Sequence, residues 1–191
     1  MSSRRLLLET PEDYHQLTYP KAIKKSKQWV LDIFAGKREQ DRIIYQNDEL
    51  VLVPNIEWSP LSEVRRSPLS EVRRSPPWDE QTLHVMAFYK RSDLRSLRDL
   101  KGSDVEMLKR TYYCCRNLIA KRYGLHIDTI KAYFHYAPTV WQLHLHFVHI
   151  NEKDHCGIEN SHNIEYVIQN LEMMPDYYQK VTLQIDSNES S

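Results

Sequence analysis

The stretch Gln142–Val148, with the sequence QLHLHFV, alternates between polar and apolar side chains. On a β-strand, side chains two positions apart share a face. The pattern therefore predicts a strand that presents Gln142, His144 and His146 on one face and buries its leucines and phenylalanine on the other. Histidine is not a favoured strand residue, and two histidines in register on one face indicate a chemical use.

The residues alone leave three interpretations of this histidine pair. His135 can complete a metal site with His144 and His146, since imidazole suits zinc and copper. The pair can also lie on the surface by chance. In the third interpretation, one imidazole is a nucleophile and the other contacts phosphate oxygens. His149 falls on the opposite face of a regular strand, which argues against a three-histidine metal motif along this strand.

The runs around this strand predict an antiparallel sheet with helices packed on it, which is an α+β fold. Ser103 and Glu106 form a possible capping box for the longest helix, and Gly36 and Gly124 are placed to end helices. The expected strands are 42–46 and 50–54 as a hairpin, 83–89, 130–136, 143–150 and 181–185, and the expected helices are 21–38, 103–122 and 161–173.

The octapeptide SPLSEVRR occurs twice in succession, at Ser59–Arg66 and Ser67–Arg74. Two such short copies are too few for a repeat architecture, so they indicate a tandem duplication inside a surface loop. We expect one domain over residues 21–186 with this loop insertion at 59–77. An N-terminal arm over residues 1–20 precedes the domain, and a disordered tail over residues 187–191 follows it.

Composition excludes several classes of function. The 191 residues carry 26 Lys and Arg and 26 Asp and Glu, and this balance argues against a protein that coats long nucleic acid. Four scattered glycines cannot form a glycine-rich phosphate loop, so side chains must handle any phosphate. Three cysteines without a C-x-x-C pair fit a reducing compartment. With neither a signal peptide nor a long apolar run, we expect a cytoplasmic or nuclear protein without a membrane partner.

The stretch Gln142–Val148 resembles the histidine-triad motif, with glutamine in place of the first histidine. The chain as a whole resembles the scavenger mRNA decapping enzymes (m7GpppX diphosphatases) from about residue 5 to about residue 185, except in the duplicated loop. The other matching segments are Gln28–Val30, Asp41–Ile43, Val53–Pro54 with Trp58, Arg95–Leu100, His135–Tyr136, Val167–Glu172 and Tyr177–Gln179.

This resemblance implies a histidine-triad-like antiparallel sheet with a long helix and a second helix packed on it. It also implies hydrolysis of m7GpppN caps, or short capped oligonucleotides, to 7-methyl-GMP and a nucleoside diphosphate during mRNA decay. His144 is then the nucleophile that forms a nucleotidyl-histidine intermediate. The family requires neither a metal nor another cofactor, and a homodimer in the cytoplasm and nucleus is expected.

The resemblance also assigns the binding residues. His135, His146, Gln142 and Thr139 correspond to phosphate-contacting positions. Trp29 and Glu39 correspond to the residues that hold the 7-methylguanine base. An indole face attracts this cationic ring, and a carboxylate accepts hydrogen bonds from the N–H groups of guanine.

Several positions depart from the family pattern. Gln142 replaces the first histidine, Asn55 an aspartate and Val140 a tyrosine, while Glu57 and Asn160 stand where a phosphate-binding lysine and arginine are expected. We also expect this chain to begin in the segment that joins the family's N-terminal lid domain to the catalytic domain. The alternatives are therefore a catalytically weak or inactive paralogue that binds 7-methylguanosine nucleotides or caps, and a hydrolase of a different nucleotide conjugate.

Overall fold

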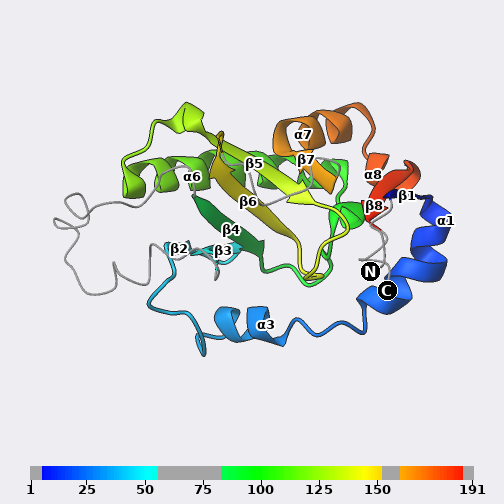
Figure 1. Cartoon of the computed structure of the whole chain (residues 1–191), viewed down its shortest axis with the longest axis horizontal. Helices are drawn as coiled ribbons and strands as arrows, with labels where there is room; N and C mark the ends of the chain where they lie inside the picture. The colour runs from blue at the N-terminus through cyan, green and yellow to red at the C-terminus, as the bar shows by residue number, and fades with distance from the viewer. Residues whose placement is uncertain (1–5, 56–82, 152–159, 187–191) are drawn as a thin grey trace.

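The computed structural model describes residues 6–55, 83–151 and 160–186. These residues form the predicted α+β fold around a six-stranded antiparallel sheet with the strand order β2-β3-β4-β6-β5-β7 (Figure 1). The duplicated loop 59–77 and the tail 187–191 lie outside the described residues. The sheet strands are β2 (Tyr45–Gln46), β3 (Leu50–Pro54), β4 (His84–Tyr89), β5 (Ile130–His135), β6 (His144–His149) and β7 (Ser161–Asn163).

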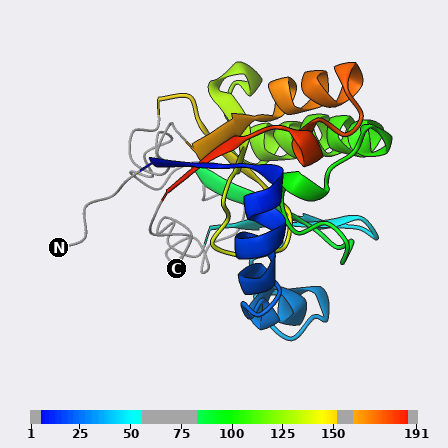
Figure 2. The ribbon, with the colours of Figure 1, turned by 90° about the vertical axis from the view of Figure 1, so that its right-hand side faces the viewer.

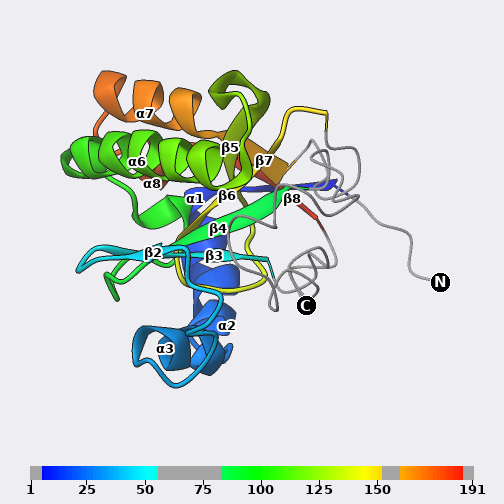
Figure 3. The same ribbon diagram turned by 90° about the vertical axis from the view of Figure 1, so that its left-hand side faces the viewer.

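Helices lie on both sides of this sheet, as Figure 3 shows. The long helix α6 (Val105–Tyr123) and helix α7 (Ile164–Met173) cover one face, and α3 (Gln28–Phe34) lies on the other side. None of the helices in the described ranges is long and apolar enough to cross a membrane. The shorter elements are α1 (Pro11–Asp13), the π-helix η1 (Tyr14–Thr18), α2 (Tyr19–Ala22), α8 (Tyr177–Lys180) and the 3-10 turns η3 (Leu97–Asp99), η4 (Gly102–Asp104) and η5 (Ile127–Thr129).

The alternation of the central strands divides the sheet into two faces. Leu145 and Phe147 of β6 belong to the main core with the apolar residues of α6 and α7. His144 and His146 therefore lie on the opposite face, as the sequence pattern predicts. The antiparallel register places His144 beside Phe88 and His146 beside Met86 on the neighbouring strand β4.

A second, smaller core forms on the histidine face of the sheet. Val30 and Ile33 of α3 pack there against Val51 and Val53 of β3 and against Phe88. This short helix lies near β3 (Figure 3).

The predicted helix over residues 21–38 is shorter in the structure, where α3 begins at Gln28 and ends at Phe34. Two local features separate it from α2. The Ser26 hydroxyl accepts a hydrogen bond from the Gln28 N–H, which competes with a continuous helix, and the lysines around Ser26 repel one another. Gly36 follows the helix with φ +71°, in the left-handed region that favours glycine.

The capping box predicted for the long helix at Ser103 and Glu106 is wrong. Helix α6 begins at Val105, and Ser103 lies inside the preceding turn η4. The Asp104 carboxylate satisfies the start of this turn by accepting a hydrogen bond from the Lys101 N–H at 2.9 Å. The predicted C-terminus is confirmed, because Gly124 ends the helix with φ +69°.

The N-terminal region is not a separate arm in the structure. Strand β1 (Leu6–Glu9) pairs with β8 (Leu183–Asp186) in a two-stranded sheet, which Figure 2 shows as the blue strand beside the red one. Glu9 is buried and forms an ion pair with buried Arg98 at 3.0 Å, and it also accepts a hydrogen bond from the Tyr136 hydroxyl. This polar cluster fixes both ends of the described chain to η3.

Replacement of Glu9 by alanine is expected to destabilise the fold by about 3–5 kcal/mol, because it leaves the Arg98 guanidinium buried without its counter-charge. Urea unfolding measures this change. Glu12→Ala, which removes an exposed carboxylate three residues away, is the control and is expected to cost under about 1 kcal/mol. Equal effects of the two substitutions would contradict the structural role of the buried pair.

Candidate active site

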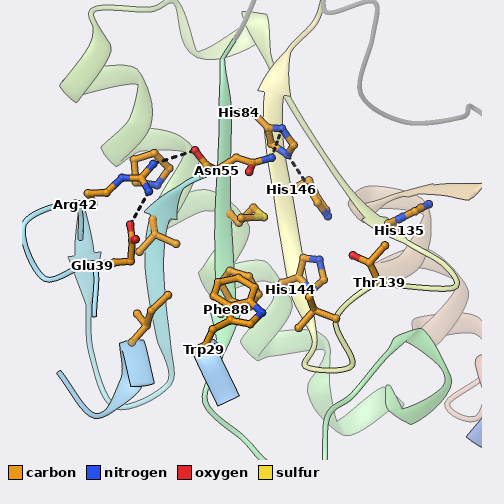
Figure 4. Close-up of a pocket in the computed structure, with 15 residues that line it drawn as sticks. Trp29, Glu39, Arg42, Asn55, His84, Phe88, His135, Thr139, His144 and His146 are labelled. Atoms are coloured by element: carbon orange, nitrogen blue, oxygen red, sulfur yellow. Dashed lines mark hydrogen bonds and ion pairs between the residues drawn. The ribbon is translucent and has the colours of Figure 1, made fainter. Parts of the chain in front are cut away.

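A cavity of about 450 Å³ opens on the histidine face of the sheet, between α3 and the loop that precedes β6 (Figure 4). Most of the residues that the family resemblance singles out lie in its wall. The lining residues are Trp29, Ile33, Glu39, Arg42, Val53, Pro54, Asn55, His84, Met86, Phe88, His135, Thr139, Val140, His144 and His146.

A series of aromatic contacts connects α3 to the histidine strand. The half-buried Trp29 ring meets the Phe88 ring edge to face, with 5.5 Å between centroids. The other contact of Phe88 is a stack with the His144 imidazole at 4.9 Å. These contacts fix His144 on the sheet and place one aromatic ring between it and Trp29 (Figure 4).

The hydrogen bond of His144 determines which of its nitrogens carries the proton. Nδ1 lies 2.8 Å from the backbone carbonyl oxygen of Gln142, and a carbonyl oxygen only accepts. Nδ1 therefore donates, and Nε2 of the neutral ring keeps its lone pair. Burial lowers the pKa of His144 to about 4, so the ring is neutral and nucleophilic near pH 7.

His146 lies beside His144, with 4.8 Å between the ring centroids, and has its own set of contacts. Its ring stacks on Tyr133 with 5.1 Å between centroids, and its Nδ1 lies 2.9 Å from Nε2 of His84. His84 in turn contacts the side-chain amide of Asn55 at 2.9 Å. Burial, reinforced by the neighbouring histidines, holds the pKa of His146 well below its usual range.

The opposite end of the cavity carries one acidic and one basic side chain. Glu39 forms an ion pair with Arg42, whose guanidinium also donates to the backbone carbonyl of Asn55 at 3.0 Å. The backbone of Glu39 has φ +57°, which is unusual for a residue other than glycine. Strained backbone of this kind is concentrated at functional sites, so Glu39 is a good candidate for ligand binding.

The structure brings together six of the seven predicted site residues, because only Gln142 does not line the cavity. Strand β6 begins at His144, so the alternation that predicted all three polar residues on one face does not extend back to Gln142. Its side-chain amide instead donates to the carbonyls of Tyr89 and Arg91, and its Oε1 accepts from Lys27. Gln142 contributes to the site through its backbone carbonyl.

Only some of the positions that depart from the family pattern lie in the described wall of the cavity. Asn55 and Val140 line the cavity, whereas Asn160 is buried outside its wall and Glu57 lies outside the described residues. His149 is also buried away from the cavity, as expected for the opposite face. Within residues 6–55, 83–151 and 160–186, no group of three or more His, Cys, Asp or Glu side chains is arranged to hold a metal ion.

Sequence reasoning missed His84, Phe88 and Arg42 as site residues. A signal for the first two was present, because alternation along the predicted strand 83–89 places His84, Met86 and Phe88 on one face. Which face this is depends on the register with β6, and the sequence does not state that register. Glu39 and Arg42 are three positions apart, which permits an ion pair, but the sequence does not indicate that this pair lies in the cavity.

A family model described as scavenger mRNA decapping enzyme C-term binding matches residues 28–162, which is most of the chain and contains the predicted site residues. The chain belongs to this family. Its curated relatives include the m7GpppX diphosphatases of Ascaris suum, with 34% identity over 97% of this chain, and of Rattus norvegicus and Homo sapiens, with 34% and 33% identity over 94% of it.

The chain spans about half of the length of these relatives, since the matches cover 58%, 50% and 50% of them. Among solved structures, Hnt3 in complex with DNA and guanosine matches with 15% identity and a TM-score of 0.33, over 64% of this chain and 60% of that chain. Likeness at this level carries no argument about function. The family assignment therefore rests on the family model and the sequence relatives.

The buried histidines predict loss of stability in acid. Burial lowers the pKa of His162, like that of His144, from 6.5 to about 4. Such a residue is neutral in the native state and protonated when unfolded, so stability that is present above pH 6.5 declines toward pH 4, by about 1.4 kcal/mol per pH unit for each histidine.

Urea unfolding at pH 7.5 and pH 5.0 measures this decline. His162→Phe is expected to lose about 1–2 kcal/mol less than the wild type between these pH values. The control is His126→Phe, at an exposed position, which is expected to decline as the wild type does. The same decline in His162→Phe and the wild type would contradict the assignment of a neutral, partly buried His162.

Proposed function

We propose that this chain is the catalytic part of a scavenger decapping hydrolase, which cleaves m7GpppN caps or short capped oligonucleotides into 7-methyl-GMP and a nucleoside diphosphate. The observation that carries the proposal is the His144 imidazole. Its Nε2 lone pair is left available by the Gln142 carbonyl, and its ring lies in a cavity that also holds Trp29 and Glu39. The names of the relatives supply the substrate class.

The first chemical step is an attack by Nε2 of His144 on the phosphorus next to 7-methylguanosine. A P–N bond forms, the bond from phosphorus to the bridging oxygen breaks, and the nucleoside diphosphate leaves. The imidazole becomes positively charged, and the Gln142 carbonyl at Nδ1 stabilises this charge. Water then attacks the same phosphorus, the P–N bond breaks, and 7-methyl-GMP is released.

The proposal assigns the phosphate oxygens to His135, His146 and Thr139, and all three line the cavity with His144. It assigns the base to Trp29 and Glu39, which line the same cavity. The cationic ring of 7-methylguanine then competes with Arg42 for the Glu39 carboxylate. The proposal includes a homodimer and a location in the cytoplasm and nucleus, as the resemblance implies.

The charge of the cavity favours a second candidate function, binding of 7-methylguanosine nucleotides with weak or no turnover. Among the described lining residues, Arg42 is the one lysine or arginine, and it is paired with Glu39. Burial keeps the His144 and His146 rings neutral. A triphosphate bridge therefore meets little positive charge in the described part of the site. The negative charge that develops on the phosphate oxygens in the transition state receives little stabilisation there.

Incubation with m7GpppG, followed by separation of the nucleotides, distinguishes these functions. The hydrolase releases 7-methyl-GMP, and His144→Asn reduces this rate by at least about a thousandfold because it removes the nucleophile. His126→Asn, at an exposed position, is the matched control and retains the wild-type rate.

Absence of release with saturable quenching of Trp29 fluorescence by m7GpppG supports the binding protein instead, and Trp29→Phe assigns the signal to this residue. Absence of both turnover and binding contradicts both functions. Release that persists in His144→Asn contradicts the assigned nucleophile.

Replacement of Glu39 by glutamine is expected to weaken binding of 7-methyl-GDP by about tenfold or more, because charge-assisted hydrogen bonds contribute about 1.5–3 kcal/mol. Binding of unmethylated GDP is expected to change less, since its base carries no positive charge. Titration calorimetry with both nucleotides measures the difference. Glu106→Gln, at an exposed carboxylate on α6, is the control, and an equal loss for both nucleotides would contradict the role of Glu39 in reading the cationic base.

A further inference from the structure

Three side chains in the wall of the candidate site form a line of hydrogen bonds. The Asn55 side-chain amide nitrogen lies 2.9 Å from Nδ1 of His84, and Nε2 of His84 lies 2.9 Å from Nδ1 of His146. Asn55 follows β3, while His84 begins β4 and His146 lies within β6 (Figure 4). Neither the family resemblance nor the motif along β6 assigns a role to His84.

The direction of each hydrogen bond in this line follows from the chemistry of its first member. An amide nitrogen only donates, so Nδ1 of His84 accepts. The proton of the neutral His84 ring is then on Nε2, which donates to Nδ1 of His146. Because Nδ1 of His146 accepts, the proton of its neutral ring is on Nε2.

The Nε2–H group of His146 is the end of the line. Nε2 is buried and has no hydrogen-bond partner within the described residues. It lies across the ring from the contact with His84, in a side chain that lines the cavity. A buried donor without a partner is costly in free energy, so this group is suited to donate to an acceptor that enters the cavity.

The two neighbouring histidines of β6 therefore have opposite tautomers. The Gln142 carbonyl leaves Nε2 of His144 with a lone pair, whereas His84 leaves Nε2 of His146 with a proton. One ring is a nucleophile and the other is a neutral hydrogen-bond donor, although both belong to the same strand face. Stacking on Phe88 and Tyr133 keeps each ring in its orientation.

We propose that His84, oriented by Asn55, is a positioning residue that holds His146 in the Nε2–H tautomer, so that His146 donates to an oxygen of the phosphate bridge. This role rests on the proposed function for its substrate, but the tautomer itself does not. A neutral donor suits a site with few cations, because it stabilises a phosphate oxygen without a buried charge.

The tautomer of His146 can be measured directly in the free protein. Long-range proton–nitrogen NMR correlation spectra, assigned with a His146→Gln variant, distinguish a protonated ring nitrogen from an unprotonated one. The proposal predicts a proton on Nε2 of His146 and on Nδ1 of His144. A proton on Nδ1 of His146 would overturn it, whatever the enzymatic activity of the chain.

Two substitutions of His84 separate positioning from simple packing. Phenylalanine keeps the ring and removes the donor, so His146 is expected to populate both tautomers. Glutamine keeps an amide donor and is expected to restore the Nε2–H form. Asn55→Leu, which removes the first donor of the line, is expected to give a mixture of tautomers and provides the test if His84→Phe does not fold. An unchanged single tautomer in the folded variants would overturn the proposal.

The kinetic readout applies if the wild type releases 7-methyl-GMP from m7GpppG. His84→Phe is then expected to lower kcat about tenfold with KM within about twofold, and His84→Gln to recover most of this loss. Equal losses in both variants would indicate packing alone and contradict the positioning role. If the wild type does not turn over, the proposed function fails, and the NMR measurement still decides the role of His84.

Discussion

The site depends on the burial of Leu145 and Phe147 between the sheet and its helices. Because side chains alternate along a strand, this burial forces His144 and His146 onto the opposite face, where they line a cavity together with residues of the short helix α3. A shift of one residue in the register of β6 would place both imidazoles in the main core. The hydrophobic core thus fixes the position of the two imidazoles. Hydrogen bonds from neighbouring backbone and side chains fix which nitrogen of each ring carries the proton.

The sequence predicted the sheet and the face of His144 from alternation along single strands, and it predicted the long helix from helical spacing. Each of these features depends on periodicity within one segment. Gln142 was placed wrongly, since the strand begins two residues later and the glutamine side chain is held by the carbonyls of Tyr89 and Arg91. The contact of His84 with His146 joins residues from different strands. No single segment of sequence contains this contact, and none contains the pairing of β1 with β8 that incorporates residues 6–9 of the predicted arm.

The described cavity combines a neutral imidazole, whose Nε2 keeps its lone pair, with little positive charge. Its aromatic wall, from Trp29 through Phe88 to His144, is suited to a flat base at one end and a reacting phosphorus at the other. Its neutral histidines supply lone pairs and hydrogen-bond donors without the desolvation cost of buried cations. The chemistry of such a site relies on the placement of dipoles, and therefore on the residues that fix each tautomer.

The proposed reaction requires that His144 forms a covalent bond to phosphorus during cap hydrolysis. Rapid acid-free denaturation of the protein during turnover of m7GpppG, followed by intact-protein and peptide mass spectrometry, detects this bond. We expect an added 7-methyl-GMP group on the peptide that contains His144, with no such adduct in His144→Asn. Release of 7-methyl-GMP at the wild-type rate by the His144→Asn variant, or an adduct on another residue, would contradict it.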